Sequence, residues 1–183
     1  THKLYGTDDP VTEDFGRQCL MARRFLERDV RFVQVTHSDS EVQWDQHSNL
    51  YLGHTKNAAE VDKPIAGLLT DLKSRGLLDS TLVLCMGEFG RTPTLGTQGS
   101  TDGRNHWPYV MSMSLAGGGF RHGQIIGASS RDGGEIAERP VTPGDLAATI
   151  YHHMGVPLNA TYNDHQGRPI FIVDEGAPLR ELV

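Results

Sequence analysis

Several features that would assign a protein to a class are scarce or missing in this sequence. No stretch approaches the roughly 20 apolar residues that a membrane-spanning helix needs, so we expect no membrane span. No run of Lys and Arg exceeds two residues, and the formal net charge is −6 with a pI near 5.8. Because binding to phosphate backbones requires clustered positive charge, we expect no nucleic-acid partner.

Cysteine is also scarce. Cys19 and Cys85 are the two cysteines, and both lie in apolar segments that read as a helix and a strand. We therefore expect two buried free thiols rather than a disulfide. The N-terminus shows no charged-then-apolar export segment, so the residues alone leave the localisation unknown.

The length and composition fit a globular domain. The chain has 183 residues, of which 37% are hydrophobic and 22% are charged. This is enough to bury one substantial core, and we expect a single domain over residues 1–183.

Three segments have the periodicity and end signals of helices. The first covers about 9–29, where apolar residues recur at helical spacing. The second covers about 62–75, with Pro64 near its start and a glycine at its end. The third begins at Thr142, an N-cap followed by a first-turn proline, and ends near residue 155.

Apolar and β-branched runs predict strands over 30–36 and 81–86, with further strands over 110–116, 124–127 and 168–173. A strand, a helix and a strand in that order indicate a right-handed crossover within a parallel sheet. The predicted fold class is therefore α/β, a three-layer sandwich with a mostly parallel central sheet.

Three polar clusters stand out: residues 44–47 (WDQH), 87–91 (GEFGR) and 103–107 (GRNHW). The first lies in a long loop of about 37–55 that follows a predicted strand, and the second directly follows another. Since open parallel sheets bind their ligands beyond the carboxyl ends of the strands, we expect the clusters to form one functional site.

Asp45 and His47 are two residues apart, so in an extended loop both side chains point the same way and offer an oxygen and a nitrogen to a cation. The alternative is a hydrogen-bonded turn under Trp44. His106 is a candidate metal ligand or proton-transfer group, with a structural histidine as the alternative. His37 and His54 flank the first cluster and are candidate supporting residues.

Glu88 follows an apolar strand, where a carboxylate needs a partner or a metal. It is a candidate metal ligand, and the alternative is a salt bridge to Arg91 or Arg104. Arg91 is either a binding group for a tetrahedral oxyanion or a structural clamp on Glu88.

These clusters resemble a known family. The matching segments are DFGRQCLMARRFLERDVRFVQV, WDQH, PIAGLLTDLKSRGLLDSTLVLCMGEFGRTP, GRNHWP, LAGGGFRHGQIIG and VTPGDLAATI, and the resemblance covers roughly residues 5–172. They look like the C-terminal half of the sulfatase-like family of domain of unknown function 1501, which is placed in the alkaline phosphatase and sulfatase superfamily.

The resemblance implies a partial alkaline phosphatase-like fold and hydrolysis of a small-molecule or glycan sulfate or phosphate ester. It implies a divalent metal (zinc, calcium or magnesium) held by Asp45, His47, Glu88 and His106. We expect the metal to act as a Lewis acid with His106 as a catalytic group, while Arg91 or Arg104 steadies the anion. It also implies an extracytoplasmic location.

Two departures from the superfamily pattern matter. Phe89 stands where the superfamily has a histidine ligand, and the spacing of Asp45 and His47 is tighter than usual. The superfamily also takes its nucleophile from the N-terminal half, so we expect this chain alone to lack the complete hydrolytic machinery. The rival hypothesis is a non-catalytic domain that binds a ligand or partner, and a third is a truncated chain that self-associates as an oligomer through exposed apolar edges.

Overall fold

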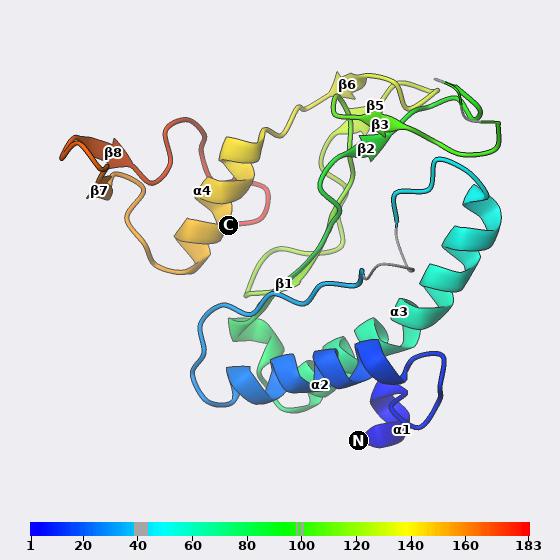
Figure 1. The fold of residues 1–183 in the computed structure, drawn as a ribbon. Coiled ribbons are helices and arrows are strands. Elements are labelled where there is room, and N and C mark those ends of the chain that lie inside the picture. Colours follow the sequence, from blue (N-terminus) through cyan, green and yellow to red (C-terminus); the bar gives the residue numbers. More distant parts are fainter. Residues whose placement is uncertain (39–43, 98, 100) are drawn as a thin grey trace. The chain divides into compact units, whose positions relative to one another are not determined.

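The computed structural model describes residues 1–38, 44–97, 99 and 101–183 (Figure 1). The chain divides into two compact units, one formed by Thr1–Leu78 and Gly87–Ser112 and the other by Asp79–Met86 and Met113–Val183. The single domain remains a prediction. Among the described residues, no helix combines the length and apolar character that crossing a bilayer requires.

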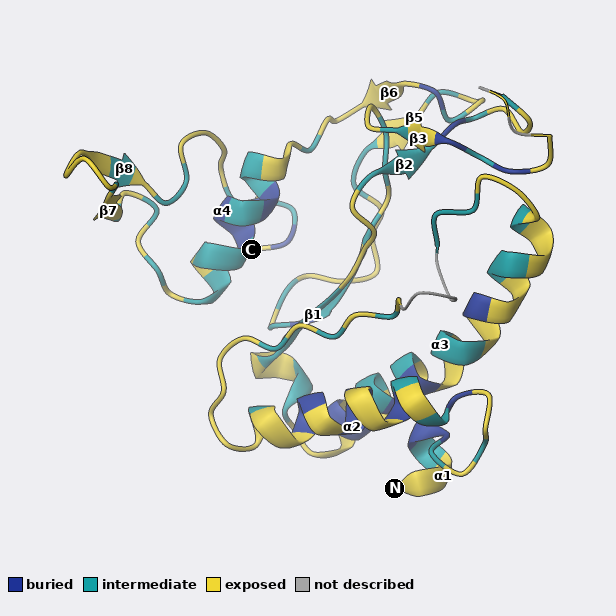
Figure 2. Cartoon of the chain, viewed as in Figure 1, coloured by how far each residue is buried: buried dark blue, intermediate teal, exposed yellow. Residues whose placement is uncertain are grey.

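The first unit is built on three helices: α1 (His2–Tyr5), α2 (Glu13–Leu26) and α3 (Leu50–Ser74). The buried residues of α2 recur at spacings of three or four and so lie on one face, which Figure 2 colours dark blue. Tyr5 and Cys19, at 0% and 2% exposure, form the centre of its core.

A buried ion network joins these helices. The Tyr5 hydroxyl donates to Oδ2 of Asp71 at 2.9 Å, and Nε of Arg75 donates to Oδ1 of the same carboxylate at 2.8 Å. Arg23 on α2 lies 3.1 Å from Oδ2. Burial and the bond to Asp71 raise the pKa of Tyr5 to about 12. Asp71 therefore fastens α3 to both other helices.

The first unit also contains a small antiparallel ladder between β2 (Gly90–Arg91) and β3 (His106–Trp107). Its register places Arg91 opposite His106. Gly90 lies so close to the next segment that a Cβ there would be 1.7 Å from the Val110 carbonyl oxygen. Glycine is thus needed for the ladder to close.

The second unit holds three further ladders and one α-helix. β1 (Leu82–Cys85) pairs antiparallel with β4 (Ser114–Gly117), β5 (Ala128–Ser129) with β6 (Ile136–Glu138), and β7 (Thr161–Asn163) with β8 (Pro169–Phe171). A short 3-10 helix, η1 (Leu78–Ser80), precedes β1.

Helix α4 (Pro143–His153) begins as the sequence predicts. Thr142 accepts a hydrogen bond from the Asp145 amide while the Asp145 carboxylate accepts from the Thr142 amide, which is a capping box. The same carboxylate also accepts from the Ala177 amide at 2.9 Å. These bonds fix the helix start and tie the C-terminal segment to it.

The predicted sandwich with a mostly parallel central sheet is wrong. Every ladder in the described residues is antiparallel and has two strands. The segment 30–36 forms no strand, and its Phe32 is 66% exposed, so this apolar run is not covered by a sheet. Without a strand there, β1 has no parallel neighbour, and it pairs instead with β4.

Other predictions are partly correct. Helix α3 begins at Leu50 rather than near residue 62, so Pro64 lies inside it, and Figure 1 shows α3 bending along its length. The predicted strand over 124–127 is wrong, since β5 begins at Ala128. Both cysteines are free, but only Cys19 is buried, and Cys85 is exposed.

Candidate metal centre

The carboxylate of Asp45 is the centre of a polar cluster in the first unit. Its Oδ1 lies 3.0 Å from Nε2 of His47 and 2.9 Å from Nε2 of His106. The ligand atoms of these three residues all lie within 4.8 Å of one another. This is close enough for one ion to contact all three, because metal–ligand bonds are about 2.0 to 2.3 Å for zinc.

The segment 44–47 divides its side chains between two sides. Asp45 and His47 contact each other, whereas Trp44 donates to His37 and Gln46 bonds to His54. This alternation is the one that an extended backbone produces. It presents the carboxylate and the imidazole together.

The β2–β3 ladder supplies the other side of the cluster. Residues directly opposite in an antiparallel pair project to the same face, and Arg91 and His106 are such a pair. Both side chains reach Asp45, Arg91 through a hydrogen bond from Nη1 to Oδ1 and His106 through Nε2. The ladder thus places Arg91 and His106, two of the predicted site residues, beside Asp45.

Asn105 fixes the ring of His47. Its side-chain Nδ2 donates to the Thr97 carbonyl, which turns Oδ1 toward Nδ1 of His47. Two hydrogen bonds to Thr92 hold the Asn105 backbone. The Asn105 amide donates to Oγ1 of Thr92 at 3.1 Å, and the Asn105 carbonyl accepts from the Thr92 amide at 2.8 Å. Because a carbonyl oxygen only accepts, Nδ1 of His47 carries a proton.

His47 therefore has oxygen acceptors at both ring nitrogens. A neutral imidazole has a single N–H, and His47 donates it to Asn105, so the lone pair of Nε2 would face Oδ1 of Asp45 at 3.0 Å. Two lone pairs at that distance repel unless a positive charge lies with them. Either a proton on Nε2 or a bound cation supplies it.

These contacts shift the pKa values of His47 and Asp45 in opposite directions. The hydrogen bond to Asn105, followed by that to Asp45, raises the pKa of His47. Burial opposes ionisation of Asp45, but the hydrogen bonds from His106, Arg91 and His47 outweigh it and lower the pKa of that carboxyl. Without a metal, the cluster thus stabilises the ionised Asp45 carboxylate and makes the His47 imidazole easier to protonate than usual.

Glu88 lies on the outer side of Arg91. The Nη2 atom of Arg91 donates to Oε1 of Glu88 at 2.9 Å while Nη1 donates to Asp45, so the guanidinium bridges two carboxylates. The Glu88 side chain is 58% exposed. Among the described residues, it is not one of the three that could share an ion.

Phe89 packs against the same groups. Its ring centroid lies 4.5 Å from that of His106 and 5.2 Å from Cζ of Arg91. The aromatic ring therefore orients both the imidazole and the guanidinium without providing a ligand atom.

Arg104 approaches the cluster from the loop before β3. Its backbone amide donates to the Gln46 carbonyl at 3.1 Å. Its Nε atom is one of the few buried side-chain nitrogen or oxygen atoms in the described residues that have no hydrogen-bond partner. Burial, and then the charges of Arg91 and Arg104, lower the pKa of His54. A positive region therefore borders the Asp45 cluster.

The family model described as "Protein of unknown function (DUF1501)" matches residues 1–183. The chain belongs to this family. No curated protein and no solved structure matches the DUF1501 chain, so the role of its polar cluster has to be argued from the cluster's own chemistry.

The DUF1501 chain thus brings together Asp45, His47, His106 and Arg91, with Glu88 and Arg104 beside them. Asn105 was not predicted to have a role. The one sequence feature that could have indicated its role is its position directly before His106, in a cluster of polar and aromatic residues. Two nitrogens, one oxygen and a neighbouring guanidinium can bind a divalent ion and an anion side by side.

Proposed function

We propose that this DUF1501 chain binds a divalent metal through Asp45, His47 and His106, and that it is a sulfatase-like hydrolase domain for sulfate or phosphate esters. The observation that carries the proposal is His47, whose two ring nitrogens both face oxygen acceptors. A metal between Nε2 and the Asp45 carboxylate resolves this conflict, because it uses the lone pairs of both atoms.

The donor set favours zinc over the other two candidate ions. Two imidazole nitrogens and one carboxylate oxygen are the ligands of catalytic zinc sites, which keep a further position open for water or substrate. Calcium and magnesium prefer oxygen ligands in larger number. Asn105 adds support, since ligating histidines commonly donate their second N–H to a carbonyl or carboxylate.

The arginines suit the binding of an anionic ester. A metal on Oδ1 of Asp45 would compete with Arg91 for that oxygen, and Arg91 could then direct an N–H to a sulfate or phosphate oxygen. The buried Nε of Arg104 is a second donor. The ion would act as Lewis acid, and the guanidinium groups would hold the charge of the transferred group.

A second candidate function is a non-catalytic domain that binds a metal or an anionic ligand. The three polar clusters contain no Ser, Thr or Cys that could serve as nucleophile. In addition, Phe89 covers His106 and Arg91 with an apolar ring. Both observations favour binding without turnover.

Metal analysis of the purified protein, titration with Zn²⁺ and a screen of sulfate and phosphate esters test these functions. We expect one Zn²⁺ per chain, and loss of binding in His106→Gln. Replacement of the exposed His165 by Gln is the matched control and should bind as the wild type does. Zn²⁺ binding with turnover supports the hydrolase, Zn²⁺ binding without turnover supports a non-catalytic metal-binding domain, and no Zn²⁺ binding refutes metal binding in either function.

A further inference from the structure

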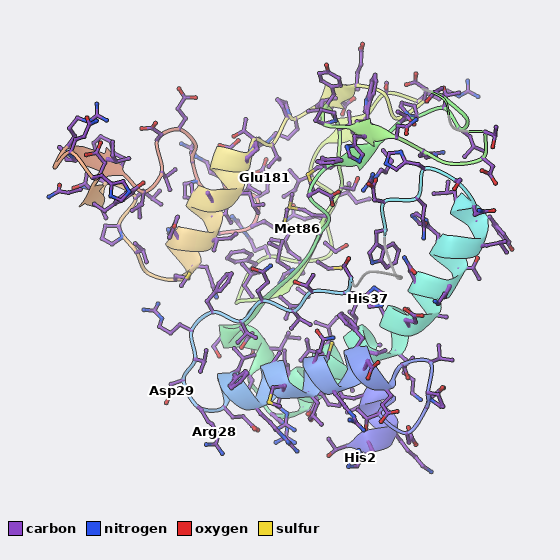
Figure 3. All side chains as sticks on the ribbon, in the orientation of Figure 1. His2, Arg28, Asp29, His37, Met86 and Glu181 are labelled. Atoms are coloured by element: carbon purple, nitrogen blue, oxygen red, sulfur yellow. The ribbon has the colours of Figure 1, made fainter. Side chains whose placement is uncertain are left out.

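The residues on either side of Asp45 are held by a separate group of side chains. Trp44 and Gln46 project away from the candidate metal ligands, toward His37 and toward His54 on α3. Figure 3 labels His37, which lies near α3. None of these four side chains is a ligand in the proposed metal site.

A chain of hydrogen bonds runs from α3 to Trp44. The indole Nε1 of Trp44 donates to Nδ1 of His37 at 3.0 Å. An indole N–H can only donate, so Nδ1 accepts, and the proton of the neutral His37 ring lies on Nε2. That nitrogen lies 3.0 Å from Oε2 of Glu60. His37 and Glu60 are 14% and 17% exposed, so water competes little for these bonds.

Gln46 is held at the start of the same helix. Its Oε1 bonds to Nδ1 of His54, and its amide lies over the bare backbone of Gly53, where a Cβ would be 2.1 Å from Nε2 of Gln46. The rings of Trp44 and His54 contact edge to face at 5.4 Å. The two anchored side chains therefore also pack on each other.

We propose that Glu60, His37 and Gly53 are positioning residues that set the geometry of the metal ligands through Trp44 and Gln46. In an extended segment, a shift of one residue moves every side chain to the other side. Fixing residues 44 and 46 against α3 therefore fixes the side from which Asp45 and His47 project. This inference rests on the proposed metal binding and extends it to residues that touch neither ion nor substrate.

The test measures the affinity of the purified chain for Co²⁺ alone, by the visible absorption of the bound ion. Glu60→Leu removes the acceptor for His37, whereas Glu60→Gln keeps a carbonyl acceptor and should restore binding. Gly53→Ala displaces the Gln46 amide, yet alanine is the better helix former, so the melting temperature should not fall. Asp62→Asn removes an exposed carboxylate from the same helix as the control.

We expect Glu60→Leu to weaken Co²⁺ binding about tenfold or more, with an altered absorption band, and Gly53→Ala to weaken it less, because the displaced Gln46 amide is the end of a flexible side chain. Glu60→Gln and Asp62→Asn should match the wild type. Wild-type affinity in both Glu60→Leu and Gly53→Ala, or an equal loss in Asp62→Asn, would overturn the inference and leave the proposed function standing. A wild-type chain that binds no Co²⁺ would overturn the proposed function, and the inference with it.

Discussion

The imidazole of His47 donates its Nδ1 proton to the side-chain oxygen of Asn105, 58 residues further along the chain. The bond selects the neutral tautomer in which Nε2 carries a lone pair instead of a proton, and it aims that nitrogen at the Asp45 carboxylate. A residue that is itself no ligand thereby determines whether His47 can be one.

Replacing Asn105 by Leu should weaken metal binding by about 10- to 100-fold, because the His47 ring loses its orienting acceptor. Asn105→Asp keeps an oxygen toward Nδ1 and should bind much closer to the wild type. Co²⁺ titration measures both affinities, and thermal unfolding separates a local effect from a loss of fold. Equal affinities for Asn105→Leu and the wild type would contradict the assigned tautomer.

The metal-free and metal-bound proteins should respond to pH in opposite directions. Because the pKa of His47 is raised in the folded state, its contribution to stability is fully present below the unfolded pKa of about 6.5 and is lost as pH rises through the folded pKa. Metal binding needs the neutral ring, so the metal affinity should increase over the same rise in pH.

Melting temperatures measured between about pH 5 and pH 9, with a chelator and with Zn²⁺, check this prediction. His47→Gln should reduce the pH dependence of both profiles, and His165→Gln should leave both unchanged. A Zn²⁺ affinity that does not vary with pH would show that His47 is not a ligand.

Local signals predicted the elements whose stabilising contacts are also local. The start of helix α4, just after its N-cap Thr142, was predicted because the capping groups lie within three residues of each other. The start of α3 was missed because its cap comes from elsewhere: the Asn49 amide donates to Oδ1 of Asp102 at 3.0 Å. Tyr51 and Leu52 near that start are 82% and 68% exposed, so no amphipathic pattern marks it.

In the candidate metal centre too, local contacts could be predicted from the sequence and long-range contacts could not. The spacing of Asp45 and His47 predicts that both project the same way, and their atoms do lie 3.0 Å apart. The pairing of Arg91 with His106 depends on a two-residue ladder that brings together residues 15 positions apart in the sequence, which no periodicity reveals. The prediction of a parallel sheet failed for a similar reason, since the strand-like composition of residues 30–36 does not specify which strand they would pair with.

Gly103→Ala should disturb the metal centre through the backbone. A Cβ at this position would lie 2.0 Å from the carbonyl carbon and oxygen of His47, and neither atom can move without shifting the ligand itself. Gly87→Ala is the control, because the nearest atom there is 3.9 Å away. We expect a lower Co²⁺ affinity and a lower melting temperature for Gly103→Ala alone. Unchanged Co²⁺ binding in that variant would contradict the close approach of the two loops.

Asp71→Leu should strongly destabilise the first unit. The substitution leaves Arg23, whose side chain is 7% exposed, without the carboxylate that faces it at 3.1 Å. Removing one partner of a buried ion pair typically costs about 3 to 5 kcal/mol. Glu13→Leu breaks the exposed pair with Arg17, where the side chains are 37% and 68% exposed, and should cost no more than about 1 kcal/mol.

Urea unfolding followed by circular dichroism measures both changes in the free energy of unfolding. Arg23 also bonds to Glu27, so part of its charge stays compensated in Asp71→Leu, and the loss should lie toward the lower end of that range. The double variant Asp71→Leu with Arg23→Met should recover stability relative to Asp71→Leu, because it removes the stranded charge while keeping apolar volume. A double variant less stable than Asp71→Leu would show that Arg23 is held mainly by Glu27 and that the network has two independent parts.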